Sequence, residues 1–153
     1  MLQPVTHWLR VGTLRTLAEG KLQTSSGDVL GQSLLPMRDL LTYRLRAEQV
    51  TLVGRMLHHT PSSADRSDAS ADDSGDMRFA RGFMLQSASV LRYLRETEGD
   101  AGISDLFGAS MNGMPVDAIL ASLPHPMIIA DLDRDWRSWV AQRSASAVAP
   151  AVR

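Results

Sequence analysis

The sequence predicts a mainly α-helical fold, a compact array of about five or six helices with one flexible insertion. Apolar residues recur at three- and four-residue steps along several stretches of the 153-residue chain, which is the spacing of one helix face. Segments rich in glycine, serine and proline separate these stretches, and such residues favour turns. With 44% hydrophobic and 22% charged residues, the composition is typical of a chain that folds around a core.

The first helix is expected to follow Thr6, because a threonine hydroxyl suits a helix N-cap. One apolar stripe then comprises Trp8, Val11, Leu14, Leu17, Ala18 and Leu22. Gly20 weakens the end of this helix. The turn-forming segment 23–33 is predicted to be a surface connection.

A second helix is predicted to begin just after Leu35, because Pro36 suits the start of a helix. Its apolar pattern extends from Leu40 through Val53 to residue 57, so the helix is expected to continue over this range. A strand over 50–53 is the alternative interpretation. Polar residues separate the apolar ones at helical rather than alternating intervals, which favours the helix.

Residues 59–76 contain no large apolar side chain and are rich in serine, aspartate and alanine. Such a segment cannot bury enough surface to offset the entropy lost on ordering. We therefore predict a flexible insertion over 58–77 within a single helical domain of residues 1–142.

The clearest helical pattern runs over residues 77–95. One face carries the residues Phe79, Phe83, Met84, Ser87, Val90, Leu91 and Leu94. Its small residues Ala80, Gly82, Ser87 and Ala88 would let a neighbouring helix approach closely. The polar run 96–100 is expected to end the helix, and two short helices are predicted over 103–111 and 116–123.

Pro124 and Pro126 interrupt the chain, and a last helix is predicted over 131–142. Trp136 and Trp139 lie at helical spacing there and are expected to be packing residues. The small residues of 143–153 predict a disordered tail.

Charge and residue usage exclude several classes of protein. Sixteen lysines and arginines against seventeen acidic residues give a net charge of −1, so no overall positive field attracts nucleic acid. The absence of cysteine excludes disulfides, thiolate metal ligands and a thiol nucleophile in this chain. No uninterrupted apolar run of roughly 18 residues occurs, which predicts no transmembrane helix. No signal peptide is visible, and the compartment remains unknown.

The histidines lack the spacing of a zinc site. His7, His58, His59 and His125 have no histidine three or four residues away, whereas a zinc-binding HExxH helix needs two histidines one turn apart. We expect these side chains to lie on the surface or to serve packing.

The acidic residues do not indicate a calcium loop either. Those within 65–76 lack the alternate spacing of an EF-hand, and Asp131, Asp133 and Asp135 are expected near a helix start, where carboxylates are favoured. Neither a G-x-S-x-G nucleophile elbow nor a glycine-rich phosphate loop occurs. The sequence thus predicts no catalytic residue, no metal ligand and no cofactor.

Two blocks resemble the gluzincin-type metallopeptidases of the peptidase MA superfamily. Trp8, Leu9, Val11 and Gly12 belong to a phrase similar to the family's W-L-x-E-G-L-A-x-Y, in which the glutamate is the third zinc ligand. Val11 occupies that position, and a valine side chain cannot bind zinc. Residues 78–94 are similar to the family's Y-A-x-x-x-x-L-V-x-Y-L helix.

This resemblance covers most of the chain and implies the helical C-terminal half of a peptidase-like fold, without the HExxH helix. It implies a fragment or degenerate relative that is non-catalytic by itself and acts by protein contacts. The implied partner is an unknown protein or a missing N-terminal catalytic segment.

Two alternatives remain open. One is a small DNA-binding regulator that uses Arg15 and Lys21 of the first helix. The other is a peptidase half completed by another chain.

Overall fold

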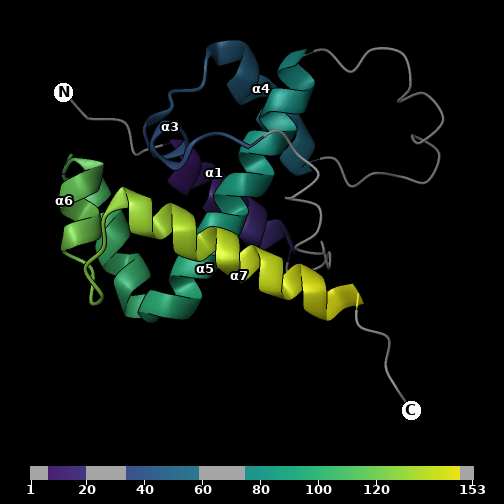
Figure 1. Ribbon diagram of the computed structural model, residues 1–153. Coiled ribbons are helices and arrows are strands. Elements are labelled where there is room, and N and C mark those ends of the chain that lie inside the picture. The colour runs from purple at the N-terminus through teal and green to yellow at the C-terminus, as the bar shows by residue number, and fades with distance from the viewer. Residues whose placement is uncertain (1–6, 20–33, 59–74, 149–153) are drawn as a thin grey trace.

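The computed structural model describes residues 7–19, 34–58 and 75–148, which form six α-helices and no strand (Figure 1). The helices are α1 His7–Glu19, α3 Met37–Thr42, α4 Ala47–His58, α5 Gly75–Met111, α6 Val116–Ala121 and α7 Ile129–Val148. The predicted mainly α-helical array is confirmed. The segment 23–33 and residues 59–74 of the predicted insertion lie outside the described residues, whereas the ends of the insertion belong to α4 and α5.

Helix α1 packs along α5 and contributes three residues to the core. Trp8, Leu9 and Val11 are all buried on this side of α1. Gly12 directly follows Val11. A Cβ atom added to Gly12 would lie only 2.8 Å from the carbonyl oxygen of Ser87 on α5. The small-residue face predicted for α5 therefore receives α1 at close range.

Helix α3 begins after Pro36 as predicted, but the chain does not continue as one helix to residue 57. Tyr43 ends α3 in an extended conformation, and α4 starts at Ala47. Two side chains stabilise this break: Leu45 N–H donates to Nδ1 of His7 at 3.0 Å, and Arg46 N–H donates to Oε1 of Gln49 at 3.0 Å. The second bond satisfies an otherwise unpaired amide at the start of α4. The strand alternative is wrong, because residues 50–53 lie in α4.

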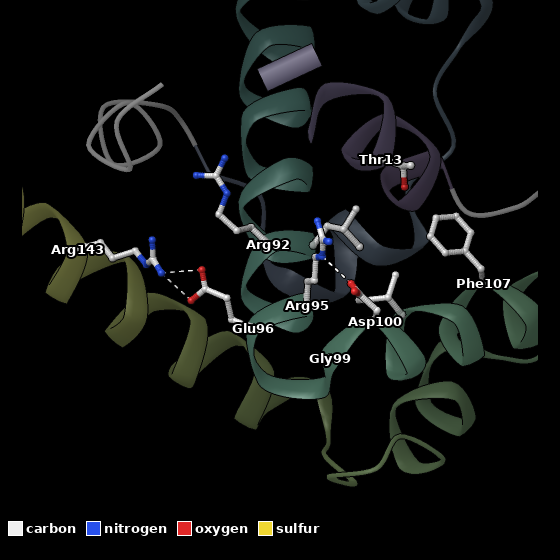
Figure 2. A pocket seen from close by; sticks show the side chains of 10 residues that line it. Thr13, Arg92, Arg95, Glu96, Gly99, Asp100, Phe107 and Arg143 are labelled. Atoms are coloured by element: carbon white, nitrogen blue, oxygen red, sulfur yellow. Dashed lines mark hydrogen bonds and ion pairs between the residues drawn. The ribbon is translucent and has the colours of Figure 1, made fainter. Parts of the chain in front are cut away.

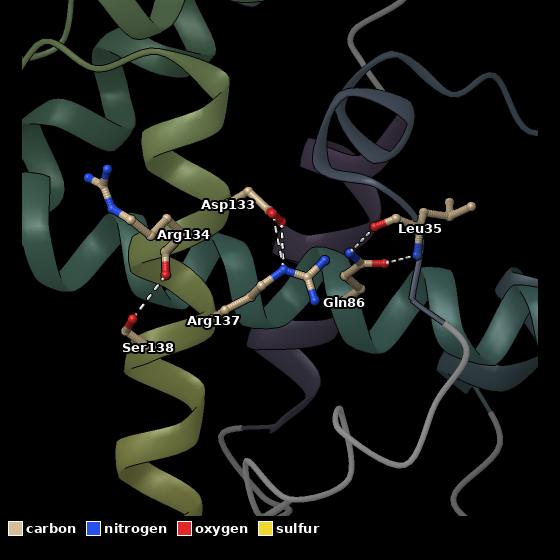
Figure 3. A network of polar contacts seen from close by, with 6 residues as sticks. All are labelled: Leu35, Gln86, Asp133, Arg134, Arg137 and Ser138. Carbon is tan, nitrogen blue, oxygen red and sulfur yellow. Dashed lines mark hydrogen bonds and ion pairs between the residues drawn. The ribbon is translucent and has the colours of Figure 1, made fainter.

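The segment before α3 is held against α5 by one buried amide side chain. Gln86 is 1% exposed; its Oε1 accepts the Leu35 N–H at 3.0 Å and its Nε2 donates to the Leu35 carbonyl at 2.8 Å (Figure 3). These two bonds satisfy the backbone groups that a non-helical segment leaves unpaired.

Helix α7 lies across α5 (Figure 1) and is longer than predicted. Trp136 is buried as expected, and its Nε1–H donates to Oγ of Ser89 on α5 at 3.0 Å. The helix continues to Val148, so residues 143–148 of the predicted disordered tail are helical. The reason is tertiary: Arg143 is paired with Glu96 of α5, a contact that local composition does not reveal.

Candidate functional site

A recess in the described residues forms where α5 changes direction. Gly99 interrupts the helix with φ 73° and ψ 177°, a conformation that is essentially restricted to glycine. The predicted end of the helix within 96–100 is thus confirmed as a break. On its inner side Glu98, whose side chain is 1% exposed, accepts the His125 N–H at 3.0 Å, which ties the break to the segment before α7.

A cleft of about 730 Å³ opens beside this break, bounded by α1, both halves of α5, and α7 (Figure 2). Its volume falls within the range of small-ligand and peptide side-chain pockets. Its apolar lining comes from Leu91, Ile103 and Phe107. Its charged lining consists of Arg92, Arg95, Glu96, Asp100 and Arg143.

One ion pair spans the break in α5. Arg95 lies before Gly99 and Asp100 after it, and Nε of the arginine is 2.7 Å from Oδ1 of the aspartate. Both side chains are largely exposed, so the pair adds little to stability. In this arrangement the Arg95 guanidinium lies at the edge of the cleft (Figure 2).

A second pair fixes α7 at the opposite edge. Nη2 of Arg143 lies 2.6 Å from Oε1 of Glu96, and Nε1–H of Trp139 donates to Oε2 of the same carboxylate at 2.9 Å. The Arg143 guanidinium also stacks over the Trp139 ring at 4.4 Å, a favourable cation–π geometry. The edge of the cleft is therefore pre-organised.

This arrangement suits binding of an amphipathic anionic group. Arginine guanidinium groups carry five N–H donors in a planar fork that matches a carboxylate, and each of the two pairs above engages a single guanidinium nitrogen. Thr13 also lines the cleft, where its hydroxyl donates to the Leu9 carbonyl at 2.8 Å.

The residues of the first block that resembles the peptidases lie in the core. Trp8 is 3% exposed, Leu9 is fully buried and Val11 is 7% exposed, while Gly12 provides the close approach to α5. A glutamate at Val11 would place an uncompensated charge among apolar side chains. This position therefore gives no support to a metal site completed by another chain.

The histidines are dispersed. His7 is tied to Leu45, and His125 is 77% exposed beside Glu98. His59 and the side chain of His58 lie outside the described residues. Within residues 7–19, 34–58 and 75–148, no group of three histidine or acidic residues is arranged to hold a metal ion.

The acidic residues singled out from the sequence, where the structure describes them, make ion pairs at the surface. Asp76 pairs with Arg46 at 3.0 Å. On α7, Arg134 lies 3.0 Å from Asp131 and 2.8 Å from Asp135, and Arg137 pairs with Asp133 at 3.0 Å (Figure 3). Asp131 also lies in the first turn of α7 as predicted. The remaining acids of the segment 65–76 lie outside the described residues.

The cleft residues were not identified from the sequence. Arg92 and Arg95 stand among ordinary polar positions of an amphipathic helix, and Arg143 falls in the predicted tail. The available signal was Gly99 directly after a cluster of charges, since a break in a long helix turns neighbouring side chains toward one another.

The half-buried imidazole of His7 predicts a specific pH dependence. Burial lowers the pKa of His7 from its ordinary 6.5, and the nearby Arg10 and Arg44 lower it further. The unfolded chain therefore binds the imidazole proton at higher pH than the folded chain does. The contribution of neutral His7 to the free energy of unfolding is present above about pH 6.5 and is lost as the pH falls through the folded pKa. We expect urea midpoints of the wild type to fall more between about pH 7.5 and about pH 5 than those of His7→Asn. Equal pH slopes for the two proteins would contradict this.

Among the described residues there is no helix whose length and apolar character would allow it to cross a lipid bilayer. No family model matches the chain, and no curated protein or solved structure is significantly similar to it. The resemblance to gluzincin-type peptidases therefore stays a prediction.

Proposed function

We propose that this chain is a non-catalytic helical binding domain whose cleft at Gly99 receives a short segment of a partner protein. The expected segment carries acidic side chains beside large apolar ones. The observation that carries this proposal is the combination of an apolar lining, Leu91, Ile103 and Phe107, with three arginines at the edge of one cleft.

Charge complementarity supports an acidic segment. Arginines outnumber carboxylates in the lining of the cleft, although the net charge of the chain is −1. An incoming carboxylate would accept hydrogen bonds from the N–H groups of Arg95 and Arg143 that do not contact Asp100 or Glu96. Because Glu96 and Trp139 already orient the Arg143 guanidinium, binding there would lose less side-chain entropy.

The apolar lining supports large side chains in the same segment. Ile103 and Phe107 are partly buried against the core and are still accessible in the cleft. A ligand that covers these side chains would bury apolar surface, which usually supplies affinity in a pocket. The polar contacts would supply specificity.

The test uses a blocked pentapeptide with the sequence Glu-Phe-Asp-Leu-Glu and titration calorimetry. We expect saturable binding that weakens with salt, and about tenfold weaker binding to Arg95→Gln because a charge-assisted hydrogen bond is lost. A peptide with lysines in place of the acids should not bind.

Arg137→Gln is the matched control. Arg137, like Arg95, is an exposed arginine paired with an aspartate, at 3.0 Å and 2.7 Å respectively, but it does not line the cleft. Its substitution should leave the affinity within about twofold. Equal losses in both variants, or equal binding of the lysine peptide, would refute the proposal.

The derivation from a gluzincin-like scaffold is a proposal about origin and stands apart from the cleft. The order of the similar helical blocks supports this origin. Stoichiometric zinc binding together with peptide cleavage by this chain would refute the proposal that the chain is non-catalytic. For the DNA-binding alternative, Lys21 and the side chain of Arg15 lie outside the described residues, and no observation favours it over the cleft.

A further inference from the structure

We propose that a second pocket, between the start of α1, the segment after α3 and the turn before α6, binds a small organic oxyanion. The ligand class is a carboxylate or phosphate carried on an apolar body. This site is independent of the cleft at Gly99, with which it shares no lining residue.

The shape of the pocket suits a small molecule. Its volume is about 490 Å³, which is within the usual range for small-ligand sites and larger than a lone ion requires. Apolar walls are formed by Leu41, Met114, Pro115 and Val116. Met114 is 40% exposed, so part of this wall is open to a ligand.

The charges of the pocket favour an anion. Arg38 and Asp117 balance each other through two N–H···O contacts of 3.3 Å. Arg44 also lines the pocket, and no described residue offers it an acidic partner. Arg44 therefore adds a positive charge to the lining of the pocket, where it can attract an anionic group.

His7 adds a neutral donor to the same pocket. Its Nδ1 accepts the Leu45 N–H at 3.0 Å, so the proton of the neutral imidazole is on Nε2, which is then a hydrogen-bond donor. Its surroundings are positive, since Arg10 and Arg44 both lower the pKa of His7 after burial. A bound anion would relieve this unfavourable field for the protonated ring.

The probe is phenyl phosphate, followed through the ring signals of His7 by NMR. We expect a saturable shift of these signals and a rise in the pKa of His7 when the probe is bound. Arg44→Gln should weaken binding about tenfold. Arg55→Gln, an exposed arginine of α4 that does not line the pocket, should leave it unchanged.

Three comparisons make the proposal falsifiable. Phenol lacks the anionic group and should not bind, whereas benzoate should bind if a carboxylate suffices. Inorganic phosphate lacks the apolar body and should bind more weakly than phenyl phosphate. Equal binding of phenol, an unchanged affinity in Arg44→Gln, or the absence of a saturable shift at His7 would overturn the assignment, whatever the outcome for the acidic peptide at the other site.

Discussion

Gly12→Ala is expected to lower the free energy of unfolding by about 2–3 kcal/mol. A Cβ at this position would lie 2.8 Å from the carbonyl oxygen and 3.0 Å from the carbonyl carbon of Ser87. Both atoms belong to the backbone of α5, which cannot rotate away as the end of a flexible side chain would. Helix α1 must therefore move off α5, which opens the packing of Trp8 and Leu9. The urea midpoint measures the loss.

Gly108→Ala is the matched control. Gly108 is also a helical glycine, but a Cβ added there meets nothing within 4 Å. Alanine should therefore stabilise the chain by about 0.5–1 kcal/mol, because it restricts the unfolded state and favours the helix. If both variants changed stability in the same direction, the close approach of α1 to α5 would be contradicted.

Gln86→Leu is expected to cost about 2–3 kcal/mol, although it places an apolar residue in the core. The substitution keeps the volume approximately but removes both bonds to Leu35 and leaves a backbone N–H and a carbonyl without their partner. The N–H of Leu35 should also lose its protection from hydrogen exchange, which NMR detects as a local effect at the start of α3.

Gln142→Leu provides the comparison for Gln86→Leu. Gln142 is exposed on α7, so the same substitution there should change stability by less than about 0.5 kcal/mol. A neutral Gln86→Leu variant with the Leu35 amide still protected would show that the buried amide does not hold this segment.

Local pattern was sufficient for the helices and for most of their buried faces. On α5, residues such as Phe83, Val90 and Leu94 are buried as their spacing predicts, and Pro36 and Gly99 mark boundaries where backbone chemistry dictates them. These features depend on residues that are neighbours along the chain.

The boundaries that sequence reasoning missed depend on distant partners. The break between α3 and α4 is stabilised by His7, which precedes Leu45 by 38 residues. The extension of α7 depends on Arg143, which pairs with a glutamate 47 residues earlier. No local propensity contains such contacts, because they exist only once the helices have packed.

The cleft was missed for the same reason. Its lining comes from three helices, and Thr13, Arg95 and Arg143 carry no motif in the sequence. The phrase that did stand out, with Trp8, Leu9, Val11 and Gly12, belongs to the packing of α1. A single chain reveals helix faces more readily than the surfaces that those helices form together.

The binding proposal is tested most directly by locating the acidic peptide on the protein. A nitroxide spin label on the Glu-Phe-Asp-Leu-Glu peptide broadens the amide signals of residues close to the bound label. We expect broadening centred on Thr13, Gly99, Ile103 and Phe107, with Val50 on α4 unaffected. Broadening centred elsewhere, or spread evenly over the surface, would contradict it.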